Sequence, residues 1–417
     1  MSLRRALFPL WWTQFCGAFN DNLYKNALIV IFTFQAQSWG IEQGSWWVNI
    51  IAALFILPFL LFSLMAGRVA DRFNKTRLIR LLKTIELILM MFGSLALLTH
   101  SLWGILSIIF LLGVHSTFFG PVKYAILPEL VKTEDLALAN GWVELGTFMA
   151  IILGTNLSAL LIPQGNVGEY LLVSTVLVVA LMGLISSFNM MITSVKDDSL
   201  KLSINPFKGI VDQLSLATQT KGLWAAIIGN SWFWFFGAVY LTQLPNYCKE
   251  VLHSTPYLVT LFWTVLAFSV AVGSLLSGRL LTTRCSTFLL PVSLIGMSVL
   301  SWPLSVLQGG SMNTVIVALI DVVLLGFFAG LYIVPMYVWI QRRTAIHQRA
   351  AILGLTNMLN ALFMIVASLL ILLGLSFGLS ISQLFGMVGG VNGVFLLALI
   401  LFARPLLLQV KDRDLLS

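Results

Sequence analysis

Long apolar runs separated by short polar segments dominate the pattern of this chain. A helix that crosses a bilayer needs about 20 mostly apolar residues, and runs of that length recur along the whole sequence. The pattern predicts twelve membrane-spanning helices, at about 8–34, 46–66, 78–99, 102–124, 137–162, 169–193, 222–248, 256–281, 286–307, 312–340, 350–376 and 380–403.

The first of these runs carries polar side chains at its centre. Asp21, Asn22 and Lys25 stand among apolar and aromatic residues. Charges in the hydrocarbon layer are costly and usually face the protein interior or a hydrated path. Asp21 and Lys25 are four apart, so they share a helix face and can pair. This pattern favours a polar route through the membrane, and a purely structural Asp21–Lys25 pair is the alternative.

Composition agrees with a membrane protein, because 59% of the 417 residues are hydrophobic and 10% are charged, against about 25% charged in soluble domains. The net charge of +8 does not indicate nucleic-acid binding, since the basic residues lie in short clusters between apolar runs. Such clusters mark cytoplasmic loops and meet anionic lipid headgroups. They fall on alternate loops, which predicts that both termini are cytoplasmic.

A polar stretch at 194–221 divides the chain into two predicted six-helix bundles, 1–193 and 222–417, the second with a short cytoplasmic tail. Its part from Ile204 to Leu216 has apolar residues at helical spacing. We expect either a helix along the membrane surface or a solvated linker. Short segments of the two bundles are weakly similar and occur in the same order. Gly67-Arg68-Val69 corresponds to Gly278-Arg279-Leu280, and Pro121 corresponds to Pro335. Duplicated halves are typical of transporters.

The segment after the second run reads Gly67-Arg68-Val69-Ala70-Asp71-Arg72-Phe73-Asn74-Lys75-Thr76-Arg77. It resembles the signature of the major facilitator superfamily between helices 2 and 3, with Asn74 and Thr76 as departures. Gly67 permits close helix approach, and Asp71 can accept from backbone amides at a helix start or pair with a nearby arginine. We predict a conformational latch of Gly67, Asp71, Arg72 and Arg77. Thr282 replaces the aspartate in the second half, where we expect no equivalent latch.

Three further motifs narrow the resemblance. They are Phe19-Asn20-Asp21-Asn22, Gly120-Pro121-Val122-Lys123-Tyr124-Ala125-Ile126-Leu127, and Asn140-Gly141-Trp142-Val143-Glu144. In this order they resemble the lysophospholipid transporter family, and most of all the transporter portion of fusions with an acyltransferase and an acyl-acyl-carrier-protein synthetase. The resemblance implies an all-α major facilitator fold in the bacterial inner membrane. It also implies movement of lysophospholipids, such as lysophosphatidylethanolamine, for reacylation, with such an acyltransferase as a possible partner.

The resemblance places Asp21, Lys123 and Glu144 on the charged positions of the family. With Asn22 and Lys25 they form the predicted substrate site, since a phosphate attracts a cation and an ammonium group attracts a carboxylate or an aromatic face. Two alternatives stay open: Lys123 as an anchor that snorkels to the interface, and Glu144 bound to a backbone amide or to Lys123. Glu86, Asp321 and His115 are further polar residues in apolar runs, for which packing is the favoured interpretation.

The sequence shows no phosphate-binding loop, zinc motif or Ser/His/Asp set, so we expect no catalytic residue, metal or other cofactor. Two rival functions remain at this stage. One is a proton-coupled exporter of drugs or small amphiphilic solutes, with Asp21 or Glu144 titrating. The other is a non-transporting, lipid-sensing scaffold for an acyltransferase.

Overall fold

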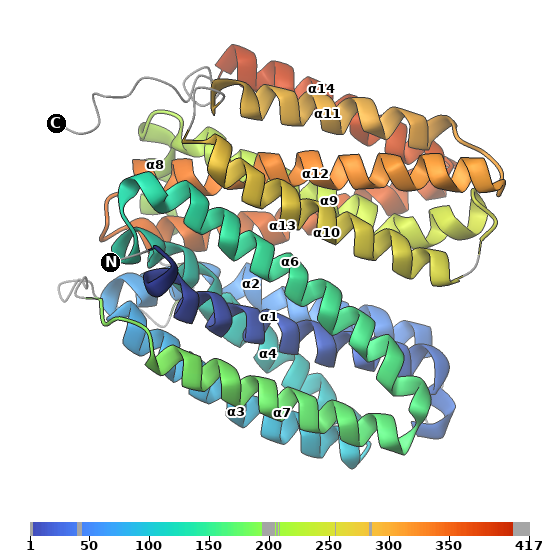
Figure 1. Cartoon of the computed structure of the whole chain (residues 1–417), viewed down its shortest axis with the longest axis horizontal. Helices are drawn as coiled ribbons and strands as arrows, with labels where there is room; N and C mark the ends of the chain where they lie inside the picture. Colours follow the sequence, from blue (N-terminus) through green and yellow to red (C-terminus); the bar gives the residue numbers. More distant parts are fainter. Residues whose placement is uncertain are drawn as a thin grey trace. The chain divides into compact units, whose positions relative to one another are not determined.

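The computed structural model describes residues 3–39, 44–193, 205, 207, 209–254, 256–282 and 286–402. The predicted tail after 403 and most of the predicted linker before residue 209 lie outside these residues. Within them every regular element is helical, and no strand occurs. Figure 1 gives the labels of the helices.

Twelve long helices fill the described part of the chain. They are α1 (Leu3–Phe34), α2 (Gly44–Arg72), α3 (Lys75–Leu98), α4 (Leu102–Ala125), α6 (Leu136–Leu161), α7 (Asn166–Phe188), α9 (Leu223–Glu250), α10 (Pro256–Leu280), α11 (Ser286–Val306), α12 (Met312–Arg343), α13 (Arg349–Ser376) and α14 (Ile381–Phe402). Each corresponds to one predicted run, so the prediction of twelve helices is confirmed.

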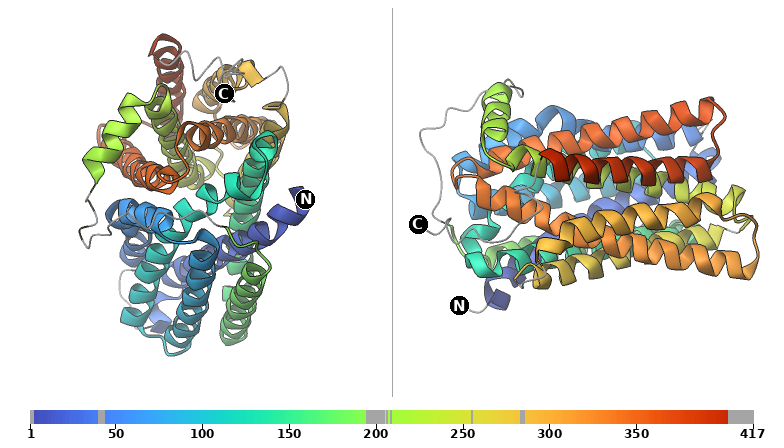
Figure 2. Two further views of the ribbon diagram at one scale, coloured as in Figure 1. Left: turned by 90° about the vertical axis from the view of Figure 1, so that its left-hand side faces the viewer. Right: turned by 90° about the horizontal axis from the view of Figure 1, so that it is seen from above.

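Short elements connect some of the long helices. They are α5 (Leu127–Leu130), α8 (Ile210–Gln219) and the 3₁₀ turns Ala36–Trp39, Thr133–Asp135 and Ile162–Gln164. The second half of the segment predicted as surface helix or linker therefore forms α8. Figure 2 shows α8 lying across the direction of α9, the long helix that follows it. This orientation favours the surface-helix interpretation for that part of the segment.

Eleven of the long helices in the described residues are long and apolar enough to cross a membrane. The exception is α1, although it has 32 residues, because its polar positions lower its hydropathy. Buried polar residues such as Thr13, Gln14 and Asn20 lie on its protein-facing side. The contacts of α1 with α2 and α7 therefore shield these polar side chains from lipid.

The end of α2 differs from the prediction. We expected a helix end near residue 66 and the signature segment in a loop, but α2 continues to Arg72. Gly67 and Asp71 therefore lie on the last turns of a helix. The next helix, α3, begins after Asn74, whose side chain accepts a hydrogen bond from the backbone N–H of Arg77 at 3.0 Å. This cap satisfies one of the free N–H groups at the start of α3, and it limits the connection to a few residues.

The chain contacts divide the protein into two compact units. The first comprises Met1–Lys132, Met149–Leu214 and Thr344–Met358, and the second comprises Thr133–Phe148, Ser215–Arg343 and Leu359–Ser417. The units differ from the predicted halves because the start of α13 belongs to the first unit and the start of α6 to the second. The predicted division at 194–221 stays a prediction from the sequence.

Inside the first unit, α2 packs on α4, α1 on α7, and α3 on both α4 and α7. Leu23, Tyr24 and Leu28 of α1 are fully buried in its apolar core, and the Tyr24 hydroxyl donates to the carbonyl of Gly93 at 2.8 Å. The hydroxyl is thus satisfied by protein where water is absent.

Inside the second unit, α10 packs along α12, and α11 on α12 and α14. The α10–α12 contact is very close at glycines. A Cβ atom at Gly330 would stand 2.2 Å from the Val270 carbonyl oxygen, and one at Gly273 would stand 2.1 Å from that of Phe327. Small residues allow such backbone approach between membrane helices. The glycines of Gly326–Gly330 therefore serve packing inside this unit, as the spacing predicted.

The close approach of α10 and α12 predicts that Gly330→Ala destabilises the protein. The added methyl group must push two backbones apart, and overpacking of this kind costs about 1–3 kcal/mol. Gly390→Ala is the matched control, because a Cβ atom there would have no neighbour within 4 Å. Thermal unfolding in detergent, followed by tryptophan fluorescence, should give a lower midpoint for Gly330→Ala only. Equal midpoints for the two variants would contradict the packing argument.

Candidate functional site

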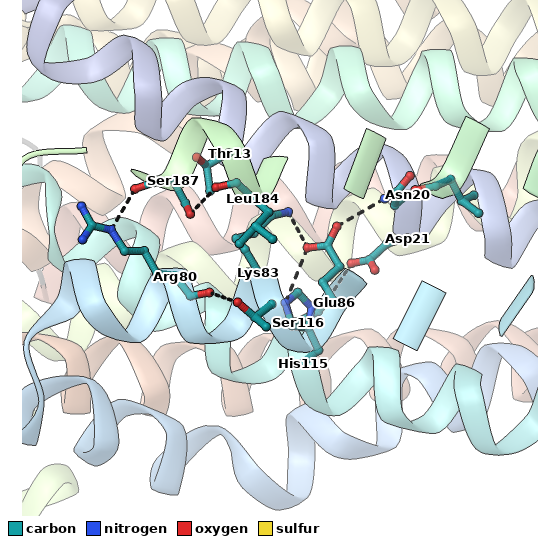
Figure 3. A network of polar contacts seen from close by, with 12 residues as sticks. Thr13, Asn20, Asp21, Arg80, Lys83, Glu86, His115, Ser116, Leu184 and Ser187 are labelled. Carbon is teal, nitrogen blue, oxygen red and sulfur yellow. Dashed lines mark hydrogen bonds and ion pairs between the residues drawn. The ribbon is translucent and has the colours of Figure 1, made fainter. Parts of the chain in front are cut away.

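A cluster of buried polar side chains lies among α1, α3, α4 and α7 in the first unit (Figure 3). Glu86 of α3 is its centre. Its carboxylate pairs with the ammonium group of Lys83, and it accepts a hydrogen bond from the Asn20 amide at 3.3 Å. The Nε2 atom of His115 stands 3.6 Å from Glu86 Oε2. Three side chains, two of them from other helices, thus converge on one carboxylate.

Helix geometry and two glycines place this cluster. Lys83 and Glu86 are three residues apart, so they lie on one face of α3, and both side chains are fully buried. A Cβ atom at Gly183 of α7 would stand 2.8 Å from Lys83 Nζ, and one at Gly17 of α1 would stand 3.2 Å from it. The lysine therefore fits because these two positions have no side chain.

Asp21 lies beside this cluster on α1. Its Oδ2 accepts a hydrogen bond from the hydroxyl of Ser116 on α4, and its buried Oδ1 has no hydrogen-bond partner among the described residues. Lys25 Nζ stands 4.9 Å from the ring centroid of Phe55 on α2. The expected Asp21–Lys25 pair is not among the ion pairs of the described residues, because each group has its own partner on a neighbouring helix.

The other predicted substrate residues lie in different places. Asn22 donates to the carbonyl of Ala18 in its own helix at 2.8 Å. Lys123, near the end of α4, has its Nζ 4.8 Å from the ring centroid of Tyr124. Glu144 is buried in α6 and belongs to the second unit. The structure therefore gathers Asp21, Asn22 and Lys25 on α1, and a joint site with Lys123 and Glu144 stays a prediction.

Exposure separates the polar residues of α1 from the centre of the cluster. Asp21, Asn22 and Lys25 are all partly exposed, whereas Lys83 and Glu86 are sealed from solvent. The first set can meet a ligand, and the second set can hold α1, α3 and α7 in place behind it.

Sequence reasoning missed Lys83 and treated Glu86 and His115 as separate packed residues. A signal was present: a lysine and a glutamate three apart in the apolar run 78–99 form a pair on one helix face. The contacts with Asn20 and His115 had no such signal, because they join residues of different helices.

The signature segment forms a contact between the end of α2 and the start of α13, inside the first unit. Asp71 Oδ1 accepts from the backbone N–H of Ala350 at 3.0 Å, and Oδ2 accepts from that of Ala351 at 2.8 Å. These N–H groups stand in the first turn of α13, where a helix has free donors and favours an anion. Asp71 therefore accepts from backbone amides at a helix start, which is one of the two arrangements considered from the sequence.

Gly67 lets the same two helices approach. A Cβ atom there would stand 2.3 Å from the carbonyl oxygen of Ala350. Arg72 is partly exposed and Arg77 is exposed. A buried ion pair between Lys75 and Glu129, 2.8 Å long, lies next along the chain. Gly67 and Asp71 thus lie at the contact between α2 and α13, and the conformational latch of Gly67, Asp71, Arg72 and Arg77 stays a prediction.

The described residues contain no candidate metal site. Over residues 3–402, outside the undescribed segments, no group of three or more His, Cys, Asp or Glu side chains could hold a metal ion. The cluster around Glu86 pairs a carboxylate with a lysine, which suits charge pairing inside the protein.

Comparison with known proteins gives a family and several relatives. The family model of the Major Facilitator Superfamily matches residues 10–368. The lysophospholipid transporter LplT of Photorhabdus laumondii is 26% identical over 351 residues, which cover 81% of this chain and 80% of that protein. The protein of the same name from Yersinia pestis is 25% identical over 356 residues, which cover 82% and 79%.

Solved structures agree at the level of the fold. The human organic anion transporter MFSD10 has a TM-score of 0.74 at 13% identity, over 96% of this chain and 100% of that one. A bacterial homologue of the iron transporter ferroportin, in an outward-facing state, has a TM-score of 0.69 at 15% identity, over 97% of each chain. At such identities the likeness concerns the arrangement of helices alone.

The Lys83–Glu86 pair predicts a strong non-additive effect on stability. Lys83→Met should leave a buried carboxylate without its cation, and breaking a buried pair in this way costs about 3–5 kcal/mol. Lys83→Met/Glu86→Gln removes both charges and should recover most of that loss. The exposed Lys221→Met is the control for loss of a lysine. The measurement is the yield of monodisperse protein and its unfolding midpoint in detergent. A double variant no better than Lys83→Met would refute the pairing.

Proposed function

The chain belongs to the Major Facilitator Superfamily, and we propose that it is a secondary transporter of lysophospholipids. It moves lipids such as lysophosphatidylethanolamine across the bacterial inner membrane, where an acyltransferase/acyl-acyl-carrier-protein synthetase restores the missing chain. The observation that carries this proposal is the pair of opposite charges on α1, Asp21 and Lys25, partly exposed in a membrane-spanning helix. The names of the relatives from Photorhabdus and Yersinia support the choice of cargo.

The chemistry of the cargo matches these side chains. A lysophosphatidylethanolamine headgroup has a phosphate, which a lysine attracts, and an ammonium group, which a carboxylate or an aromatic ring attracts. Asp21 supplies the carboxylate, Lys25 the cation, and Phe55 a ring that already faces an ammonium group. Lys123 and Glu144 are proposed as further contacts at other depths of the path.

The sealed cluster behind α1 has a supporting role in this proposal. Glu86 and Lys83 join α3 to Asn20 of α1, and the Asn20 amide also donates to the Val176 carbonyl of α7 at 3.1 Å. A headgroup site needs side chains held in fixed positions. The bonds to Asn20, next to Asp21 in the chain, fix the turn of α1 that carries the site.

The proposed orientation of the helices in the membrane follows from the positions of the basic loops. Lys and Arg gather in cytoplasmic loops, so the ends of α2, α10 and α12 and the starts of α3, α9 and α13 lie on the cytoplasmic side, as do both termini. Asp71 and Gly67 are then a cytoplasmic latch. Alternating access breaks the Asp71 contact with α13 in the inward-open state and forms it again in the outward-open state.

The direct test is a transport assay in proteoliposomes with lysophosphatidylethanolamine and its two-tailed parent. We expect movement of the single-tailed lipid only, because the proposed path admits the headgroup together with one acyl chain and not with two. A proton-coupled exporter would instead stop when a protonophore is added and would accept amphiphiles without a phosphate. A lipid-sensing scaffold would bind the lysolipid and move none.

Asp21 and Lys123 provide a test at the level of residues. Asp21→Asn and Lys123→Met each remove one charge and keep the size of the side chain. A hydrogen bond to a charged group is worth about 1.5–3 kcal/mol, so each variant should slow lysophospholipid movement at least about tenfold. Lys249→Met, at an exposed position of α9, is the control and should behave as wild type. Normal transport by both site variants would remove these residues from the mechanism.

The latch predicts a change of state when its carboxylate is removed. Asp71→Ala loses both bonds to the start of α13, so the cytoplasmic end should open more often. Spin labels at Phe73 and Gln348, both exposed, report the opening as a longer distance in a background whose cysteines are replaced by alanine. Glu134→Ala, an exposed acid, is the control. Unchanged distances in Asp71→Ala would show that the contact does not hold the closed state.

A further inference from the structure

A reciprocal pair of carboxamides joins α6 to α12 inside the second unit. The Asn140 amide donates to Gln341 Oε1 at 2.7 Å, and the Gln341 amide donates back to Asn140 Oδ1 at 3.1 Å. Both side chains are fully buried. The two residues are 201 positions apart in the sequence, and they lie near the start of α6 and the end of α12.

The backbone around this pair repeats the packing at Asp71. A Cβ atom at Gly278 of α10 would stand 2.7 Å from the Ala137 carbonyl oxygen of α6, and one at Gly141 would stand 2.7 Å from that of Ser274. In the first unit, Gly67 approaches Ala350 in this way, and Gly354 approaches the Ser63 carbonyl oxygen, at 2.3 Å. The same kind of glycine-mediated approach therefore occurs in both units.

The charged part of the first contact has no copy in the second. Thr282 stands where the aspartate would be, and its hydroxyl donates to the Arg279 carbonyl of its own chain segment at 2.7 Å. An amide pair that the sequence analysis did not predict instead joins α6 to α12 beside the glycine contact of α6 with α10, and Asn140 is next to Gly141 in the chain.

We propose that Asn140 and Gln341 form a second, uncharged latch of the cytoplasmic end, which complements the Asp71 latch during transport. This inference rests on the proposed function for its meaning in the transport cycle. The pair holds α6 against α12 while that end is closed, and it separates when the end opens.

The hydrogen bonds of Asn140 explain why the pair suits this role. Its amide also donates to the Leu136 carbonyl of its own helix at 2.9 Å, so the orientation of the carboxamide is fixed before Gln341 binds. When the helices separate, each carboxamide loses a partner in a region poor in water, which is unfavourable until water enters. Opening is therefore linked to hydration of this end.

A neighbouring contact acts between the same two regions. The Arg342 guanidinium donates to the Thr133 carbonyl at 3.2 Å, one residue beyond Gln341 and just before α6. This bond is exposed, where hydrogen bonds and charges are weak. Of these two contacts, the buried amide pair is therefore the one that can determine the equilibrium between the closed and open states of this end.

The test uses the full chain with its native cysteines replaced by alanine and spin labels at Glu134 and Thr282, both exposed residues of the second unit. Thr282 follows α10, which packs along α12. Asn140→Leu/Gln341→Leu removes the pair without leaving an orphan amide. Hydrogen bonds between membrane helices average about 0.6 kcal/mol, so loss of two should raise the open fraction on the order of five- to tenfold. The exchange variant Asn140→Gln/Gln341→Asn keeps an amide pair of the same total length and should restore the closed distances.

Tyr240→Phe is the matched control. It removes one buried hydrogen bond of the second unit, from the Tyr240 hydroxyl to Ser301 at 2.7 Å, and should leave the distances unchanged. Every variant is first checked for a monodisperse, folded state by its unfolding midpoint. Wild-type distances in the folded Leu/Leu variant would overturn the latch.

The two proposals fail separately. The label distances need no substrate, so they test the latch even if the wild-type protein moves no lysophospholipid, a result that would refute the proposed function alone. If transport occurs, the Leu/Leu variant should change the maximal rate and leave the affinity for lysolipid unchanged, because neither residue belongs to the proposed headgroup site. An equal loss of affinity would count against the latch.

Discussion

The structure depends on one constraint: a polar group in a membrane-spanning helix must find its partner inside the protein, since lipid offers none. Glu86 meets this constraint with three partners from three helices: Lys83 of its own helix, Asn20 of α1 and His115 of α4. Those bonds hold together helices whose apolar surfaces would pack about as well against lipid. The glycines at 17 and 183 belong to the same solution, because they leave room for the lysine. The bond from Asn20 to Glu86 fixes the turn of α1 that carries the partly exposed charges.

The same constraint acts at the ends of the helices. The first N–H groups of α13 have no partner in their own helix, and Asp71 accepts from two of them. Between α6 and α12, two carboxamides satisfy each other. Both contacts stand where glycines bring backbones together, so the bonds are buried and short-lived exposure to water is needed to exchange them. In the proposed latch role, each contact has a closed and a hydrated state, as a moving gate requires.

The sequence predicted the twelve helices because hydropathy and length decide membrane spans almost without tertiary information. It also pointed to Asp21 and Asp71, since a charge inside an apolar run and an acid in a signature segment are visible in one dimension. It placed Gly67 in a loop, whereas α2 continues through it, because a basic cluster resembles a loop until its packing on α13 is known. Lys83 was missed, and so was the Asn140–Gln341 pair. The partner of Lys83 is Glu86, three residues away in the same helix, so a local signal existed for that pair. Asn140 and Gln341 are 201 positions apart, and no local pattern records their proximity.

The two units solve the constraint with different chemistry. In the first unit the central bonds join charged groups, Lys83 with Glu86 and Lys75 with Glu129. In the second unit three bonds between buried side chains join neutral groups: Trp232 with Asn392, Tyr240 with Ser301, and Ser231 with Asn360. Breaking a buried ion pair costs several times more than breaking a neutral bond. Helices joined by charges therefore resist rearrangement more strongly than helices joined by amides and hydroxyls. A protein that must hold a charged headgroup in one place and still change shape gains from both, with α1 on the stiffer network and the amide-joined helices free to adjust.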